Sequence, residues 1–330
     1  MNGGGSIRRR VWRAAAGLVL AALTAGAAER VFLTPRLGAL GLCEVARPGG
    51  PPRAAFTNRW RRVEVEAGSR RIVHDGVLVY LNGAVRRERN AWSVDPVDWA
   101  EGIAFPWIAA SLPVRRKNDR VLLDPGHGGR DKGAISSRQV EESRVTMDVA
   151  RRAAKILRAR GVVVAFTRDG DKTLSLGDRI AIARRVKPDA FVSVHVNATG
   201  NPAVRGVETF VMTAPGYAST AGTRPDKQAY AGNRQGVLNM RLAHAIQGSL
   251  LAYTGAPDRG VKRARFAVLQ HATAPAALVE IGFLTNRSDE AALISRAYRD
   301  KIAEGVARGI LSFLTLNRKP PAAGEQGNKP

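Results

Sequence analysis

Between residues 120 and 316 the sequence alternates short apolar runs with longer amphipathic segments of helical period. Runs that are apolar throughout are typical of strands in a sheet covered by helices on both sides. We therefore predict an α/β fold with a central, mostly parallel sheet covered by helices on both faces. The expected strands are 121–125, 161–167, 190–196, 207–212, 266–270 and 277–281, and the expected helices are 142–160, 176–186, 237–253 and 298–316.

The sequence before residue 118 has a different pattern. Short runs of period-two alternation are separated by turn pairs such as Asp75-Gly76 and Asn82-Gly83, which is typical of small β-rich structures. We predict a small β-rich N-terminal module at 28–117, to which no chemistry is assigned, and a second domain at 118–316. The expected strands of the module are 62–67, 71–74, 77–81 and 91–94, and the Pro- and Gly-rich segment 47–53 is expected to be a connector before them.

The first 27 residues predict a signal peptide. Four arginines precede an uncharged apolar run at 14–28, in which Ala25-Gly26-Ala27 resembles a cleavage site. The run is shorter than the ~20 residues of a spanning helix, so we expect an exported protein with no stable membrane span after cleavage. Both Sec and twin-arginine export fit the sequence. The Pro-, Gly- and Lys-rich tail at 317–330 is predicted to be disordered.

Charge and cysteine content limit the partners. The chain has 52 Lys and Arg against 28 Asp and Glu, a net charge of +24, and removal of residues 1–27 takes away four positive charges and leaves +20. For an exported protein without a recognisable nucleic-acid motif, this charge favours anionic envelope polymers or lipid head groups over nucleic acid. The single cysteine, Cys43, excludes an internal disulfide and a four-thiolate zinc site.

Polar side chains at the expected strand ends predict a catalytic site. His127 follows the first of these strands and His195 ends the third, so both imidazoles lie at the edge where such sheets bind ligands. Glu142 begins a helix and can approach His127. Two histidines and one carboxylate form the ligand set of a catalytic zinc site. Glu280, a carboxylate in an apolar strand, suits the general base that such a site needs.

The remaining histidines and one long loop are less specific. We expect His74, in the β-rich part, and His244, on an amphipathic helix, to be core or solvated residues. His271 follows the expected strand 266–270 and is a candidate for a place near the site. Segment 213–236 lacks apolar periodicity, and connections of this length in compact domains are usually functional or disordered.

Several blocks of the sequence occur in an order and spacing known from one enzyme family. They are LLDPGHGGRDKGA (122–134), ESRVTMDVA (142–150), TRDGD (167–171), LGDRIAIARR (176–185), SVHVNA (193–198), RGVETFVM (205–212), DRGVKRARFAVL (258–269) and PAALVEIGFLTN (275–286). Together, over about residues 119–316, they resemble the zinc-dependent N-acetylmuramoyl-L-alanine amidases of the bacterial cell wall.

The resemblance implies a fold similar to zinc exopeptidases and one Zn²⁺ held by His127, Glu142 and His195, with Glu280 as the catalytic residue. The implied reaction is hydrolysis of the amide bond between N-acetylmuramic acid and L-alanine in peptidoglycan, in the periplasm or outside the cell. Glu141 stays open as an alternative metal ligand, because it is adjacent to Glu142.

Residues around the site receive lesser roles. We expect Arg259 to contact the anionic substrate or the oxyanion, and Asn197 to orient His195 or bind glycan. Lys262 is a second candidate for the same contact as Arg259, although we expect it rather to be solvated at the surface. Arg179 is expected to pair with a carboxylate beside its helix.

Two rival functions stay open: a zinc peptidase that cuts within the stem peptide, and a non-catalytic peptidoglycan-binding protein. In some members of the family, a segment after the second histidine region blocks the site until a partner displaces it, so an unknown activator protein is a candidate partner. Because segment 213–236 lacks a helical period, we expect a mobile lid or substrate wall here. Deletion of 214–233 is then expected to change activity on intact sacculi more than on small fragments.

Overall fold

The computed structural model describes residues 30–47, 50–112 and 119–315, so the predicted signal peptide and C-terminal tail lie outside the described residues. The strands are β1 (Val31–Phe32), β2 (Cys43–Arg47), β3 (Arg53–Thr57), β4 (Arg62–Glu66), β5 (Arg71–His74), β6 (Val77–Tyr80), β7 (Arg86–Glu88), β8 (Ala91–Val94), β9 (Arg120–Pro125), β10 (Val163–Phe166), β11 (Ala190–Asn197), β12 (Val207–Met212), β13 (Asp258–Ala264) and β14 (Ala276–Phe283). The helices are α2 (Leu33–Ala39), α3 (Pro96–Asp98), the π-helix η1 (Trp99–Ile103), α4 (Phe105–Ser111), α5 (Glu142–Arg158), α6 (Leu176–Val186), the 3₁₀-helix η2 (Ala231–Gln235), α7 (Gly236–Thr254), α8 (Ala267–Gln270), α9 (Arg287–Ile294) and α10 (Arg296–Thr315).

One large sheet runs through the described chain, and its strands follow the order β10-β9-β11-β14-β12-β13-β6-β5-β4-β3-β2. Strands β10, β9, β11 and β14 are parallel to one another. Strand β12 is antiparallel to β14, and β13 and β6 run parallel to β12. The strands β2 to β6 form antiparallel hairpins. This arrangement confirms the predicted α/β class, with a mostly parallel centre preceded by a β-rich part.

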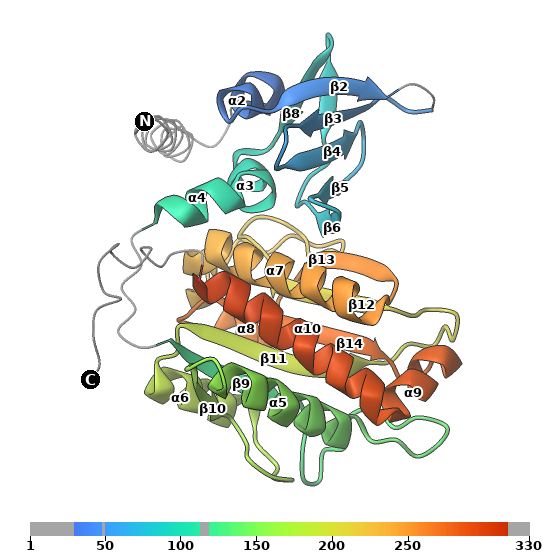
Figure 1. Cartoon of the computed structure of the whole chain (residues 1–330). Coiled ribbons are helices and arrows are strands. Elements are labelled where there is room, and N and C mark those ends of the chain that lie inside the picture. Colours follow the sequence, from blue (N-terminus) through green and yellow to red (C-terminus); the bar gives the residue numbers. More distant parts are fainter. Residues whose placement is uncertain (1–29, 48–49, 113–118, 316–330) are drawn as a thin grey trace, which may run out of the picture.

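Helices cover the central sheet on both faces, as Figure 1 shows. Helices α5, α7 and α10 pack on one face, and the shorter α6 and α8 lie on the other. Side chains of β11 alternate between the two cores: Val192 and Val194 join the larger one, whereas Phe191 joins the smaller one. The first residues of the strand are apolar on both faces because both faces are buried there. The polar residues Ser193, His195 and Asn197 follow on the face of Phe191.

The β-rich part contains four strands that the sequence pattern missed, β1, β2, β3 and β7. Segment 47–53 is predicted as a connector before the module, but Arg47 ends β2, Arg53 begins β3, and these two residues pair with each other. Asp75 and Gly76 form the predicted turn between β5 and β6, with φ angles of 49° and 82°. The helices α2, α3, η1 and α4 were also not predicted.

The expected strand at 266–270 is wrong, since residues 267–270 form α8 and the strand lies earlier, as β13. Charged side chains hid this strand in the sequence. Arg259 and Lys262 pair with the buried Glu208, and Arg263 pairs with Glu101. Their charges are compensated by partners far away in sequence, so no apolar run marks the strand.

Strand β13 joins the N-terminal strands to the central sheet. Val261 pairs with Val79 of β6, and the Leu78 amide donates a hydrogen bond to Asp258 Oδ2 at 2.8 Å. Gly260 has a φ of 86°, and a Cβ there would lie 2.8 Å from the Leu78 carbonyl oxygen. Only glycine allows so close an approach at this φ. The domain boundary near residue 118 stays a prediction, because one sheet extends across both parts. Among the described residues, no helix is long and apolar enough to cross a membrane.

Candidate active site

The turn after β9 positions the first histidine of the site. The Gly126 amide donates to the Val194 carbonyl at 2.9 Å, and a Cβ on Gly126 would lie 2.3 Å from Cε1 of His195. His127 itself has a φ of 57°, an uncommon conformation for a residue with a side chain. The glycine at 126 therefore allows the two histidines to approach each other.

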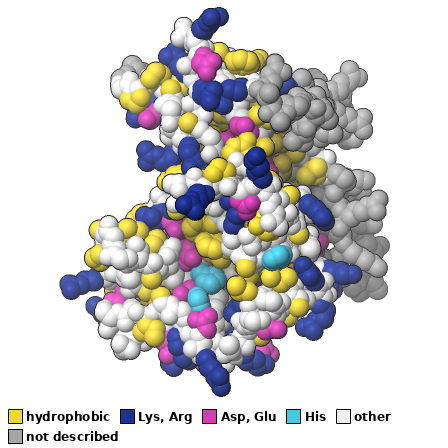
Figure 2. All heavy atoms as spheres, turned by 180° about the vertical axis from the view of Figure 1, so that it is seen from behind, with side chains coloured by type: hydrophobic (Ala, Val, Ile, Leu, Met, Phe, Trp, Pro, Cys, Tyr) yellow, Lys and Arg dark blue, Asp and Glu magenta, His cyan; other side chains and the backbone are white. Residues whose placement is uncertain are grey.

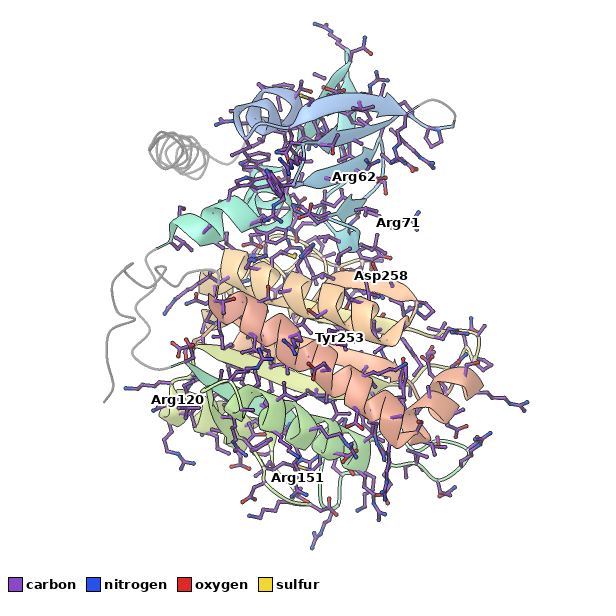
Figure 3. All side chains as sticks on the ribbon, in the orientation of Figure 1. Arg62, Arg71, Arg120, Arg151, Tyr253 and Asp258 are labelled. Atoms are coloured by element: carbon purple, nitrogen blue, oxygen red, sulfur yellow. The ribbon has the colours of Figure 1, made fainter. Side chains whose placement is uncertain are left out.

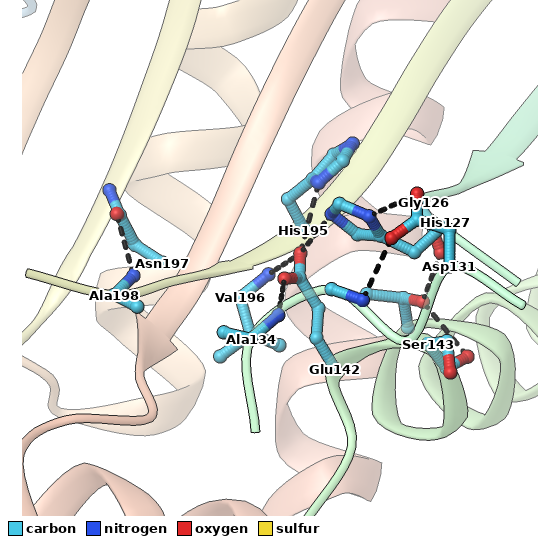
Figure 4. A network of polar contacts seen from close by, with 12 residues as sticks. Gly126, His127, Asp131, Ala134, Glu142, Ser143, His195, Val196, Asn197 and Ala198 are labelled. Atoms are coloured by element: carbon cyan, nitrogen blue, oxygen red, sulfur yellow. Dashed lines mark hydrogen bonds and ion pairs between the residues drawn. The ribbon is translucent and has the colours of Figure 1, made fainter. Parts of the chain in front are cut away.

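Three side chains from β11, α5 and the turn after β9 converge (Figure 4). Glu142 Oε1 lies 3.2 Å from His127 Nε2 and 3.0 Å from His195 Nδ1. One ligand atom from each of the three residues lies within 4.8 Å of the others. The structure thus brings together the three residues expected to bind metal, in an arrangement that could hold one ion.

The cluster is supported by a second layer of hydrogen bonds. Asp131 Oδ2 lies 2.8 Å from His127 Nδ1, so this carboxylate holds the ring with Nε2 toward Glu142. Glu142 Oε2 accepts a hydrogen bond from the Ala134 amide at 2.9 Å, and its Oε1 accepts one from the Val196 amide at 3.0 Å. Such partners orient metal-binding histidines and carboxylates in proteins.

The hydrogen bonds within the cluster favour the ionised form of Glu142 between the two imidazoles. A hydrogen bond to Glu142 raises the pKa of His127, against the opposing effect of burial. Burial alone would raise the pKa of Glu142, but hydrogen bonds from His127 and His195 hold it well below its ordinary value. The buried Glu142 is therefore ionised at neutral pH and offers a negatively charged oxygen ligand.

Glu280 lies on β14, directly opposite His195 of β11 in the parallel register. Only 8% of its surface is exposed, and within the described part of the chain its Oε2 has no hydrogen-bond partner. Burial, followed by the negative charges of Glu142 and Glu208, raises the pKa of Glu280 well above its ordinary value. A carboxyl group with a raised pKa can accept a proton and later donate it.

The adjacent Glu141, the alternative ligand, lies outside the cluster. Its Oε2 lies 2.7 Å from Arg144 Nε and 3.7 Å from Lys132 Nζ. The helix begins at Glu142, so consecutive residues point in different directions.

Glu208 on β12 is a buried carboxylate that the sequence analysis missed. It is 3% exposed and pairs in register with Glu280 on the neighbouring strand. It accepts hydrogen bonds from Asn197 Nδ2 at 3.0 Å, Arg259 Nε at 2.7 Å and Lys262 Nζ at 2.5 Å. The signal that could have identified it is the one used for Glu280, a carboxylate in an otherwise apolar strand.

This network changes the interpretation of three residues. Asn197 donates to Glu208, and the hydrogen bonds of its side chain do not include His195. Arg259 also contacts the ring of Phe283, with its guanidinium carbon 4.9 Å from the ring centroid. The prediction of a solvated Lys262 is wrong, because its side chain is only 14% exposed and its ammonium group pairs with Glu208.

Two buried arginines hold the turn that carries His127. Arg179 pairs with Asp124 at 2.6 Å, which confirms its predicted structural role, and also donates to the His127 carbonyl at 2.7 Å. Arg168, not singled out from the sequence, donates to the carbonyls of Pro125 and Gly126 at 3.0 and 2.9 Å. The backbone of this turn is thus fixed by two guanidinium groups.

The other histidines lie away from the cluster. The expectation of a core position is confirmed for His74 and His244, because both are buried. His244 Nε2 lies 2.9 Å from the His74 carbonyl oxygen. His271 follows α8 and lines a small cavity with Arg179 and Phe191. Phe191 lies at the start of β11, whereas His195 lies near its end, so His271 lies at the edge of the sheet opposite the site.

Segment 213–236 also lies at this opposite edge. Strand β12 runs antiparallel to β14, so it starts near Glu280 and ends away from it. The segment that follows is held by Arg265, whose Nη2 donates to the carbonyls of Ala214 and Tyr217 at 3.2 and 2.7 Å. The expectation of a lid or substrate wall is therefore wrong, because the antiparallel strand carries the loop away from the site.

Figure 2 shows histidine and acidic side chains side by side on the face turned away from α5, α7 and α10. Two imidazoles and a carboxylate at the carboxyl edge of parallel strands, with a second buried carboxyl group beside them, define the class of this protein. It is an α/β enzyme whose site is built like that of a metal-dependent hydrolase.

Comparison with known proteins gives the family. The N-acetylmuramoyl-L-alanine amidase model Amidase_3 matches residues 121–312, more than half of the chain. The amidase LytC of Bacillus subtilis (strain 168) is 34% identical over 212 residues, which are 63% of this chain and 39% of LytC. The amidase AmiA of Salmonella typhimurium is 34% identical over 218 residues, which are 59% of this chain and 75% of AmiA.

Solved structures agree. The amidase AmiC2 of Nostoc punctiforme is 35% identical with a TM-score of 0.50, and the match covers 59% of this chain and 96% of that one. The chain belongs to the N-acetylmuramoyl-L-alanine amidase family of cell-wall hydrolases. The N-terminal part, residues 30–112, lies outside the family match.

Proposed function

We propose that His127, Glu142 and His195 hold one Zn²⁺ and that Glu280 moves protons in the hydrolysis of the amide between N-acetylmuramic acid and L-alanine. The observation that carries this proposal is the convergence of three ligand atoms within 4.8 Å, beside Glu280 on the next strand. Family membership supports the substrate, peptidoglycan, and the bond that is cut.

The donor set fits zinc. Imidazole nitrogen and carboxylate oxygen are ligands that Zn²⁺ takes in catalytic sites, where three protein ligands leave one position open. The ring of His127 is already oriented by Asp131 Oδ2, 2.8 Å from Nδ1. When bound, zinc would polarise the scissile carbonyl and acidify a water molecule.

Proton transfer falls to Glu280. Its raised pKa and its Oε2, which lacks a protein partner among the described residues, suit a group that accepts a proton and then donates it to the leaving nitrogen of L-alanine. We further propose Asn197 and Arg259 as substrate contacts. Both are held by Glu208, so their amide and guanidinium groups are fixed before substrate binds.

The compartment and the partners are also proposals. The signal-peptide pattern at 1–27 supports export to the periplasm or the cell exterior, where peptidoglycan is found. An activator protein stays a candidate partner.

The test is digestion of purified peptidoglycan sacculi by the mature protein, with new L-alanine amino groups as the readout. We expect Glu280→Gln to lower the rate by about 100-fold or more, the usual range for a lost general acid–base group. Glu141→Gln is the matched control, because it removes an adjacent acid outside the cluster, and it should keep most of the activity.

Each other outcome points elsewhere. Release of a different amino group would replace the proposal by a peptidase that cuts within the stem peptide. Binding without release of any amino group, in the presence of added zinc, would support a non-catalytic peptidoglycan-binding protein.

A further inference from the structure

The sheet face that carries the candidate site continues over the N-terminal strands. Side chains alternate along a strand, so residues paired directly across neighbouring strands share a face. Six neighbouring strands place on this face, in order, His195, Glu280, Glu208, Lys262, Tyr80 and Arg71. The opposite face belongs to α7, where Gln247 bonds to Thr209 and Gly248 packs against Val77.

A groove of about 250 Å³ crosses this face over β3 to β6. Val73 and Leu78, which pair across β5 and β6, contribute apolar surface, and Arg47, Arg53 and Arg71 contribute cationic groups. In Figure 3, Arg71 lies between Arg62 of β4 and Asp258 of β13 along one side of the molecule. The groove is therefore part of the same continuous sheet as the site.

Two of the three arginines that line the groove, Arg47 and Arg53, have an acidic partner. Arg47 lies 3.3 Å from Glu64, and Arg53 lies 2.7 Å from Glu66. The guanidinium of Arg71 has no acidic partner within the part of the chain that the structure describes. An exposed cation beside apolar surface suits a carboxylate carried on a short aliphatic chain.

The distance between Glu280 and Arg71 decides which part of a peptidoglycan substrate can supply a carboxylate to Arg71. Four strand spacings of ~4.8 Å separate β14, which carries Glu280, from β5, about 19 Å in all. A stem peptide of about four residues spans at most ~14 Å when fully extended. A stem attached to the muramic acid at Glu280 therefore cannot reach Arg71, whereas another part of the same polymer can.

We propose that the groove over β3 to β6 is a second peptidoglycan-binding site, in which Arg71 binds a carboxylate of a neighbouring stem peptide. The N-terminal part thereby extends the substrate site along one sheet face and selects polymer over small fragments. This inference rests on the proposed function for the identity of the polymer.

The first test measures binding without cleavage. Full-chain Glu280→Gln protein is sedimented with purified sacculi, alone and with Arg71→Glu or Arg86→Glu added. Arg86 is an exposed arginine of β7, in the separate sheet β1-β8-β7, so its variant carries the same charge change away from the groove. We expect Arg71→Glu to weaken binding about fivefold, less at high salt, and Arg86→Glu to bind like its parent.

The second test measures the ratio of the rate on sacculi to the rate on a soluble muramoyl tetrapeptide. We expect Arg71→Glu to lower this ratio and Arg86→Glu to keep it. Equal effects of the two variants, or equal loss on both substrates, would overturn the proposal. So would a binding loss seen with anionic phospholipid vesicles but not with sacculi, which would assign the groove to a membrane. The sedimentation test needs no cleavage, so it would still test the second binding site if the amidase assay failed.

Discussion

At the residue scale, buried charge is concentrated where the chemistry is proposed. Glu142, Glu208 and Glu280 are each less than 9% exposed, and each has a different environment. Glu142 lies between two imidazoles, Glu208 binds two cations, and Glu280 has the negative charges of the other two nearby. The pKa of Glu142 is thereby lowered and that of Glu280 raised, although the two side chains are identical.

A buried histidine away from the site gives a pH prediction. Burial, followed by the charge of His74, lowers the pKa of His244 to about 3, against ~6.5 in the unfolded chain. Between these values the unfolded state binds the extra proton, so stability is complete above pH ~6.5 and falls as pH decreases. We expect His244→Gln to remove about 2 kcal/mol of the stability difference between pH 7 and pH 5, measured by urea unfolding. Identical pH slopes in both proteins would contradict this.

At the element scale, β13 connects the N-terminal strands with the catalytic sheet. It pairs with β12 on one side and β6 on the other. Its Arg263 is 1% exposed and lies 2.9 Å from Glu101 of η1. This buried ion pair couples the helices of the N-terminal part to the central sheet.

Breaking this pair should be costly. We expect Glu101→Ala to lower the free energy of unfolding by about 3 kcal/mol, because it leaves Arg263 buried without its partner. The double variant Glu101→Ala/Arg263→Met should recover most of the loss, since no charge is then buried. Urea denaturation measures both. A loss below ~1 kcal/mol in the single variant would show that the guanidinium finds another partner.

At the scale of the whole molecule, the proposed metal ligands come from three separate elements, β11, α5 and the turn after β9. An ion bound there would cross-link them in the folded state only and would stabilise that state in proportion to its occupancy.

Metal removal should therefore lower stability as well as activity. We expect a chelator to lower the Tm by several degrees, corresponding to about 4 kcal/mol for a site at a thousand times its Kd, and Zn²⁺ to restore it. In the variant His127→Ala the chelator should have no such effect. Calorimetry with metal analysis measures both results, and an unchanged Tm with no bound metal in the native protein would contradict the zinc proposal.

Local patterns in the sequence predicted most strands and helices of the central sheet, but not β13. Largely apolar runs predicted β9, β10, β11, β12 and β14, and helical period predicted α5, α6, α7 and α10, because both faces of this sheet are buried. The same strands predicted that His127 and His195 lie at one edge with Glu280 near them, since parallel strands end together. The metal role of these residues stays a prediction.

Only the tertiary structure decided the rest. The charged strand β13 and the carboxylate Glu208 are stable inside the sheet because each charge has a partner from a distant segment, and no local pattern records such a partner. Because β12 runs antiparallel to β14, segment 213–236 and His271 lie at the edge of the sheet opposite the site. Pairing of β6 with β13 extended the site face over the N-terminal strands. Strand direction and strand neighbours depend on contacts between segments far apart in sequence, whereas strand and helix periodicity depend on burial along each segment itself.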